Sequence, residues 1–163
     1  MEQRDLARSV NYLFTVSDNR DATYNVQSAN VADINLGVTP FGSRYKDLFI
    51  PSNKIETENL IAQILISDDH REWLYFYKWM LKCKNNGPNN YALPCELTAL
   101  DSQNQESTRF IYLDCFPTNM EGIQYSSAGE STVLSTTVSF RFNQFKIVDV
   151  NGNEIDESWN GDL

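Results

Sequence analysis

The single histidine of this 163-residue chain, His70, lies in the segment SDDHREW directly after Asp68 and Asp69. An imidazole beside two carboxylates can bind a metal ion or act in acid–base catalysis. A zinc site needs further ligands at a distance in the sequence, and any serine or cysteine nucleophile would have to use this same histidine. An aspartate before an apolar periodic segment more often caps a helix, and Glu72 follows Asp69 at capping-box spacing. The segment is therefore predicted to be a helix start rather than a metal site.

The three cysteines, Cys83, Cys95 and Cys115, follow no CxxC spacing. An odd number without such spacing argues against a disulfide framework, so reduced, half-buried thiols are predicted, with a Cys83–Cys95 bridge as the alternative. The sequence contains no GxSxG, P-loop or GxGxxG motif. It therefore predicts no enzyme, no metal and no cofactor, with a hydrolase built on two carboxylates as the alternative.

The composition indicates one soluble globular domain, with 41% hydrophobic and 21% charged residues. No apolar run approaches the roughly 20 residues of a membrane span, and the segment MEQRDLARSV lacks the apolar core of a secretory signal. The chain is expected to stay in the compartment where it is made. The net charge of −9 excludes an ordinary nucleic-acid binder, which needs a basic surface.

The apolar periodicity predicts about seven strands and one major helix. Strands are expected at residues 11–17 and 23–31, paired as a hairpin, at 58–67 as a central strand covered on both faces, at 95–100, 108–116, 119–125 and 131–148. A short helix is predicted at residues 2–10. The major helix follows Asp69, with Trp73, Phe76, Tyr77 and Met80 on one face, and ends before the Asn-Gly-Pro of KNNGPNN.

The segment 32–57 is predicted to be an irregular loop, because it contains two glycines and two prolines. It is unusually apolar for a loop, and it either folds back on its own core or docks on a neighbour. Its apolar residues are Leu36, Val38, Phe41, Tyr45, Leu48, Phe49 and Ile50.

The predicted long strand 131–148 alternates in its first part. One face carries Leu134, Thr136, Val138, Phe140 and Phe142, and the other carries Val133, Ser135, Thr137, Ser139 and Arg141. The predicted fold is mainly β with one flanking helix (α+β), an antiparallel β-sandwich or small barrel that joins its neighbours in a ring. Residues 1–148 form its single domain, and residues 149–163 form an acidic extension with five acids and no base.

Three segments together resemble the tail tube proteins of contractile-tailed bacteriophages, over residues 11–145. These are NYLFTVS, then NLIAQILISDDHREW followed by FYKWM, and finally LDCFPTNMEGIQYSSAGESTVLSTTVSFRFNQF. Baseplate tube initiators and the type VI secretion tube protein belong to the same superfamily. The extension after residue 145 departs from the family pattern.

The resemblance implies a structural subunit that forms hexameric rings, stacked helically around a channel that conducts viral DNA into the host. The apolar residues of 32–57 would contact the adjacent ring, and Ser135, Thr137, Ser139 and Arg141 would lie on the tube wall. DNA would pass without specific binding. The implied partners are a sheath outside the tube and baseplate and tail-terminator proteins at its ends, in a virion tail assembled in the cytoplasm of the host bacterium. The alternatives are a baseplate tube initiator and a non-catalytic ligand-binding β-domain.

Overall fold

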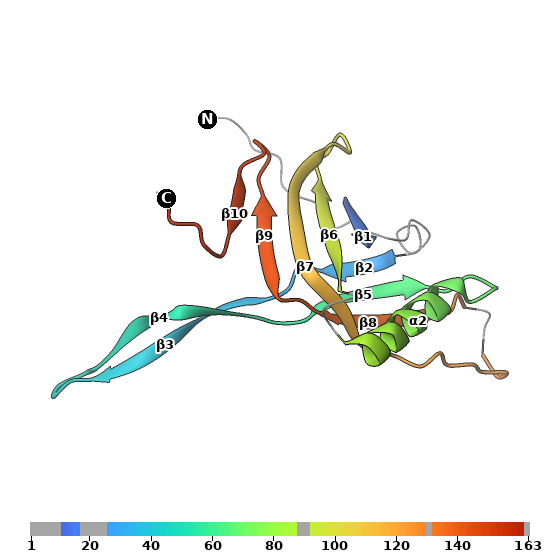
Figure 1. The fold of residues 1–163 in the computed structure, drawn as a ribbon, viewed down its shortest axis with the longest axis horizontal. Helices are drawn as coiled ribbons and strands as arrows, with labels where there is room; N and C mark the ends of the chain where they lie inside the picture. Colours follow the sequence, from blue (N-terminus) through green and yellow to red (C-terminus); the bar gives the residue numbers. More distant parts are fainter. Residues whose placement is uncertain (1–10, 17–25, 88–91, 130–131, 162–163) are drawn as a thin grey trace.

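The computed structural model describes residues 11–16, 26–87, 92–129 and 132–161 (Figure 1), so the helix predicted for residues 2–10 lies outside the described residues. The described part contains ten strands and one helix, and the prediction of a mainly β chain with one flanking helix is confirmed. No helix in these ranges is long and apolar enough to cross a membrane. In chain order the elements are β1 (Tyr12–Val16), β2 (Val26–Asn30), β3 (Ile34–Gly42), β4 (Asp47–Thr57), β5 (Leu60–Leu65), α2 (Arg71–Asn86), β6 (Leu93–Leu100), β7 (Glu106–Met120), β8 (Ser135–Arg141), β9 (Gln144–Val148) and β10 (Glu154–Asp156).

Eight of these strands form the body of the domain as two antiparallel layers that share β7 (Figure 1). One layer has the order β1-β6-β7-β9-β10, and the other has the order β7-β8-β5-β2. The predicted hairpin between residues 11–17 and 23–31 is wrong, because β1 pairs with β6 and β2 pairs with β5. Local turn signals identify where a strand ends but not which distant strand it pairs with.

Strand β7 is the longest in the described chain, with 15 residues, and it belongs to both layers. It bends at Asp114, whose backbone has a positive φ of 54°. The register shows why: Leu93 and Cys95 of β6 are opposite Cys115 and Tyr112, so β7 carries one extra residue at the bend. Such a bulge turns a strand from one sheet into the next. The strand predicted at 108–116 is therefore part of one longer strand with a corner, and of the strand predicted at 119–125 only residues 119 and 120 are strand, at the end of β7.

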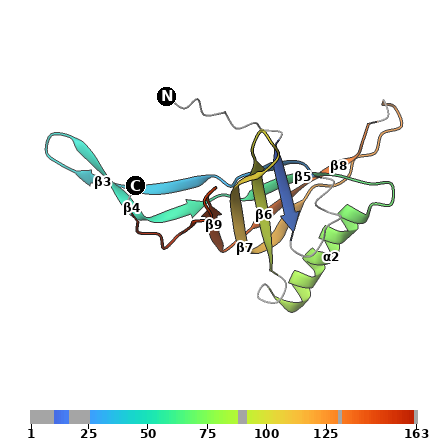
Figure 2. The same ribbon diagram turned by 90° about the horizontal axis from the view of Figure 1, so that it is seen from above.

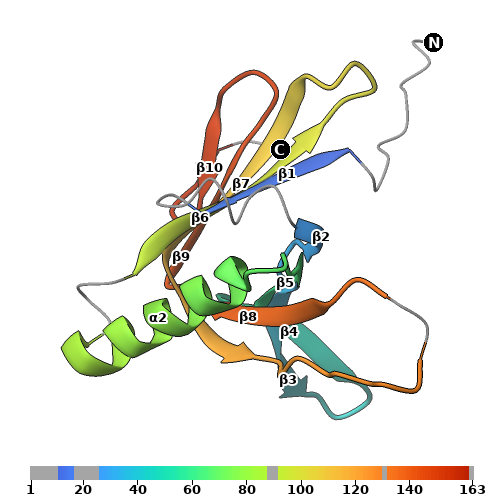
Figure 3. The same ribbon diagram turned by 90° about the vertical axis from the view of Figure 1, so that its right-hand side faces the viewer.

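The core lies between the two layers and under α2, which crosses their open side (Figure 3). Phe140 of β8 is its aromatic centre, with ring centroids 5.8 Å from Phe76, 5.9 Å from Trp79 and 6.2 Å from Phe14. The helix buries Glu72, Phe76 and Trp79, while the predicted core residue Tyr77 is 45% exposed. The apolar face of the helix is thus rotated from the predicted one, because residues three apart share a face.

Strand β5 lies in the middle of its layer, but only one of its faces is fully covered. Leu60, Ala62 and Ile64 are completely buried, while Ile61 on the other face is 39% exposed. The prediction of cover on both faces is therefore wrong for the single chain.

The ends of the strand order approach each other at β1 and β2. The Tyr12 hydroxyl lies 3.5 Å from the Val26 carbonyl oxygen, and burial raises the pKa of Tyr12. The Tyr112 hydroxyl accepts a hydrogen bond from the Ala32 N–H at 3.2 Å. Burial is the main reason that the pKa of Tyr112 is raised to about 12.

Strands β3 and β4 pair only with each other and form an arm that projects from the body (Figures 1 and 2). The arm begins where the Glu58 N–H donates to the Asp33 carbonyl at 2.9 Å. The prediction of an irregular loop at 32–57 is therefore wrong. Of the two roles left open for this segment, folding back on the core is excluded, because almost every residue from 34 to 56 is exposed.

The predicted long strand 131–148 is two strands with different partners. Strand β8 pairs with β5 and β7, whereas β9 pairs with β7 and β10. The chain passes between the layers at residues 142–143. In the acidic extension, β10 pairs with β9 and adds a strand to that layer. The boundary at residue 148 stays a prediction.

Candidate functional site

His70, Asp68 and Asp69 take part in local hydrogen bonds at the start of α2. His70 Nδ1 lies 3.0 Å from the Asp68 carbonyl oxygen, and Nε2 lies 2.5 Å from the Tyr125 hydroxyl. Asp69 accepts from the Ser67 hydroxyl at 2.7 Å, which lowers the pKa of this carboxyl. Within the described residues, no three His, Cys, Asp or Glu side chains are placed to hold a metal ion. This segment therefore organises the helix start.

The helix start differs from the predicted capping box in one respect. His70, not Asp69, is the N-cap residue. Its backbone is left-handed, with a φ of 56°, and its side chain makes no capping hydrogen bond to the helix. Glu72 is 3% exposed and accepts from the Ser67 N–H at 3.0 Å, and it shares the one hydroxyl proton of Ser67, at 2.6 Å, with Asp69. A buried carboxylate here is satisfied by these two donors.

All three cysteines are free, so the Cys83–Cys95 alternative is wrong. Cys95 and Cys115 are fully buried rather than half-buried, and only Cys83 has intermediate exposure. A hydrogen bond from Cys115 and burial raise the pKa of Cys95. These two thiols are packing residues of the core.

The arm carries nine of the 20 large apolar residues that are exposed in the described part of the chain. Every apolar residue predicted for the segment 32–57 lies on it, with exposed fractions of Leu36 54%, Val38 64%, Phe41 57%, Tyr45 91%, Leu48 50%, Phe49 69% and Ile50 50%. Isolated exposed apolar residues are common, but a continuous set of this kind marks an interaction surface.

The arm is apolar on both of its faces. Directly paired residues of an antiparallel ladder share a face. Leu36 is opposite Ile55, and Pro40 is opposite Phe49, whereas Thr39 is opposite Ile50 and Phe41 is opposite Leu48. Because the two sets alternate along the ladder, Phe49 and Phe41 lie on different faces. A single partner surface can cover only one of them.

The predicted wall residues lie together on the outer face of β8. Ser135, Thr137 and Ser139 are partly buried and Arg141 is exposed, while the alternate residues Thr136, Val138 and Phe140 are buried in the core. The Ser135 hydroxyl accepts from the Gln63 amide at 3.2 Å, and Arg141 donates to the Asn59 side-chain oxygen at 2.9 Å. This face is polar, and it carries a single charge.

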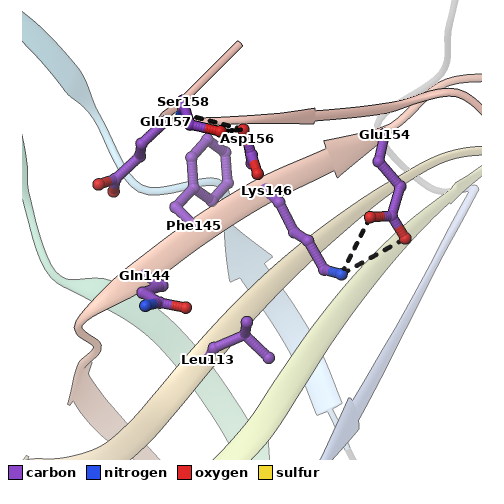
Figure 4. Close-up of a pocket in the computed structure, with 8 residues that line it drawn as sticks. All are labelled: Leu113, Gln144, Phe145, Lys146, Glu154, Asp156, Glu157 and Ser158. Carbon is purple, nitrogen blue, oxygen red and sulfur yellow. Dashed lines mark hydrogen bonds and ion pairs between the residues drawn. The ribbon is translucent and has the colours of Figure 1, made fainter.

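Sequence reasoning missed two further surfaces. The first is a stripe on the outer face of α2, where Leu74, Tyr77 and Leu81 are exposed. The second is a recess of about 300 Å³ between β9, β10 and the following turn (Figure 4). The signal for both was the charge distribution, since the helix holds four of the 13 basic residues and the extension holds no base.

Known proteins match this chain in structure but not in sequence. No protein-family model matches the chain, and no curated protein matches it by sequence. Solved structures do match. A chain of the anti-feeding prophage baseplate has a TM-score of 0.69 at 14% identity, covering 92% of this chain and 99% of that chain. A chain of the sheath-tube complex of the extracellular contractile injection system PVC has a TM-score of 0.70 at 10% identity, covering 89% and 93%. Hcp1 from Salmonella typhimurium has a TM-score of 0.55 at 15% identity, covering 89% and 90%.

These matches extend over nearly the whole chain. The chain therefore has the fold that contractile injection system proteins and Hcp proteins share. The predicted resemblance to the tube superfamily is confirmed at the level of the fold, and the antiparallel β architecture with one helix is confirmed with it.

Proposed function

We propose that this chain is the repeating subunit of a tail tube, in which hexameric rings stack helically around a central channel. The observation that supports this proposal most directly is the arm of β3 and β4. It shares no core with the body, and it exposes large apolar side chains on both faces. A single chain gains no burial from such an element, so its sequence is explained by a partner.

The two apolar faces indicate how the arm is used. Because Phe41 and Phe49 lie on different faces, a position between two neighbouring copies buries both, whereas a flat docking surface buries only one. Insertion of the arm into the adjacent ring places it between copies. A head-to-tail contact of this kind repeats without closing on itself and generates a helical filament.

The outer face of β8 suits the wall of the channel. Ser135, Thr137 and Ser139 present uncharged hydroxyl groups, and the one charge of this face, Arg141, donates to the Asn59 side-chain oxygen. The whole chain has a net charge of −9. An acidic protein repels the phosphate backbone, so viral DNA passes through the channel without the electrostatic binding that a basic surface provides. The role of the subunit is structural and non-catalytic.

In this proposal a sheath surrounds the tube, and baseplate and terminator proteins contact its two ends. The assembly belongs to the virion tail of a bacteriophage and forms in the cytoplasm of the host bacterium. The supporting comparison is the match to a chain of a sheath-tube complex.

A second candidate is a tube initiator, a protein that forms the first ring on a baseplate. The similarity to a chain of the anti-feeding prophage baseplate favours it. The two roles differ in outcome, because an initiator forms one ring, whereas a tube subunit adds ring upon ring.

The test is negative-stain electron microscopy of the purified full chain at rising concentration. Hollow tubes with stacked rings are the result expected for a tube subunit, and single six-fold rings that never stack favour the initiator. A field of monomers at the highest concentration, with and without added baseplates as seeds, contradicts both roles.

A further inference from the structure

The outer face of α2 is basic in an acidic protein. The helix carries Arg71, Lys78, Lys82 and Lys84, and its one acid, Glu72, is buried. The exposed charges of the helix itself are therefore positive, and the one at its start, Arg71, pairs with the Asp69 carboxylate at 2.6 Å. Alongside them, Leu74, Tyr77 and Leu81 are 42%, 45% and 37% exposed and form one stripe, since their positions follow the helical repeat.

The recess at β9 and β10 has the opposite charge. Leu113 of β7 and Phe145 of β9 are its apolar lining residues. Glu154, Asp156 and Glu157 line the recess from the side of β10 and the turn after it (Figure 4). Lys146 is its single base, and its ammonium group lies 3.4 Å from the Glu154 carboxylate. The three acids therefore outnumber the one base in the recess, and all three lie in the segment that follows β9.

These two surfaces cannot meet within one chain. Figures 1 and 2 show β9 and β10 on one side of β6 and α2 on the other. One copy therefore offers a basic surface at one side and an acidic surface at the other, each with an apolar centre. Complementary patches at different places on the same chain produce head-to-tail contacts between copies.

We propose that the exposed stripe of α2 in one copy docks into the β9–β10 recess of a neighbouring copy. Tyr77 or Leu74 enters the recess, and Lys78 lies beside the carboxylates of the partner subunit. The inference rests on the proposed function only in taking the partner to be a second copy of this chain. It assigns a role to the C-terminal extension, which departs from the tail-tube pattern of the sequence.

The two parts of the contact contribute differently. Apolar burial of Leu74 and Tyr77 favours association, whereas the charges set which surfaces meet and how fast. Charges at a rim are screened by salt, so the contact weakens as ionic strength rises. The apolar arm of β3 and β4 responds to salt in the opposite direction or not at all, which separates the two contacts experimentally.

The test is a charge exchange in the full chain. Lys78→Glu and Glu157→Lys each place like charges together, and each is expected to raise the critical concentration for assembly by roughly threefold to tenfold. The variant that carries both substitutions restores the pair between copies and the original net charge, so assembly returns toward the wild-type level. Glu106→Lys, an exposed acid at the start of β7, is the matched control and is expected to leave assembly unchanged.

A cross-linking measurement covers the case in which a charge variant misfolds. Chains with Leu74→Cys and chains with Ser158→Cys, both also carrying Cys83→Ser, are mixed and treated with a short bismaleimide. A covalent product of one chain of each kind is expected, and no product of two Leu74→Cys chains.

The outcomes separate the two proposals. If both charge-reversal variants assemble at the wild-type critical concentration, the docking of α2 in the recess is overturned. The same holds if assembled material gives no mixed cross-link. Either result leaves the tube proposal standing. Failure of the wild-type chain to assemble at all, with or without seeds, overturns both.

Discussion

Replacing Phe41 and Phe49 by serine is expected to abolish assembly and leave the fold intact. The two phenylalanines lie on different faces of the arm, 57% and 69% exposed. If insertion between neighbours completes their burial, each loses the part of its burial energy that the single chain does not already provide. Full burial of a phenylalanine side chain is worth about 1.5–3 kcal/mol, so the exposed fraction accounts for about 1–2 kcal/mol at each position.

The two losses together amount to about 2–4 kcal/mol for each subunit contact, which corresponds to a roughly 30-fold to 1,000-fold weaker association. The free energy of unfolding of the single chain is expected to change by less than about 0.5 kcal/mol, because neither phenylalanine side chain packs on the core. The double variant is therefore a folded monomer that cannot stack.

Sedimentation velocity at rising concentration measures the association, and urea unfolding followed by tryptophan fluorescence measures the stability. Val133→Ser is the control, since Val133 is 71% exposed but lies outside the arm. Tube formation by the double variant at the wild-type concentration would refute the role of the arm. A loss of stability above about 1 kcal/mol would show that the arm packs on the body, against the structure.

Three further predictions concern the body of the domain. Spectroscopic titration is expected to show that Tyr112 ionises only near its pKa of about 12. Because this folded pKa is raised, the stability that it contributes is complete below about pH 10 and is lost as the pH rises toward 12, which urea unfolding at several pH values measures. Asp114→Gly is expected to preserve or slightly raise the melting temperature, whereas Asp114→Val costs about 1–2 kcal/mol, because a β-branched residue fits a positive φ poorly. In the native protein a thiol reagent is expected to modify Cys83 at most, and Cys95 and Cys115 are expected to react only on unfolding. Reaction of all three thiols at the same rate in the native protein would contradict the burial of Cys95 and Cys115.

The sequence predicted best the elements whose pattern is local. The alternation of β8 was read correctly, since Val138 and Phe140 face the core and Thr137 and Ser139 face outward. The position of the helix was correct within two residues of its start. Strand β8 has one apolar and one polar face, which is the pattern that periodicity detects. The helix has apolar residues on its outer face as well, so its position was predicted correctly but its buried face was not.

The arm was missed for the same physical reason. A strand with apolar residues on both faces shows no period of two, so Phe41 and Phe49 indicated an irregular loop. Its apolar composition left two roles open for the segment, folding back on the core or docking on a neighbour, and the exposure of the arm excludes the first.

The sequence does contain an indication of the break between β8 and β9, in the positions of its apolar residues. The apolar face of β8 uses even positions, up to Phe140, whereas Phe145 of β9, at an odd position, stacks on Tyr112 of the core with ring centroids 5.2 Å apart. A change of parity requires an interruption in the strand. Strand pairing itself could not be predicted, because the pairing of β1 with β6 joins residues that are 79 to 87 positions apart, from Val16–Cys95 to Tyr12–Ala99.

The continuity of β7 through both layers has a consequence for how the domain comes apart. Before Asp114 the strand pairs with β6 and β9, and after Asp114 it pairs with β8 and, at Cys115, with the start of β6. Neither layer can lose its order without removing a strand from the other, so the body unfolds cooperatively as one unit. A pull on the β9 edge is carried along one covalent backbone to the β8 side. In the proposed tube, an axial load on a subunit therefore passes through peptide bonds rather than through the packing between layers.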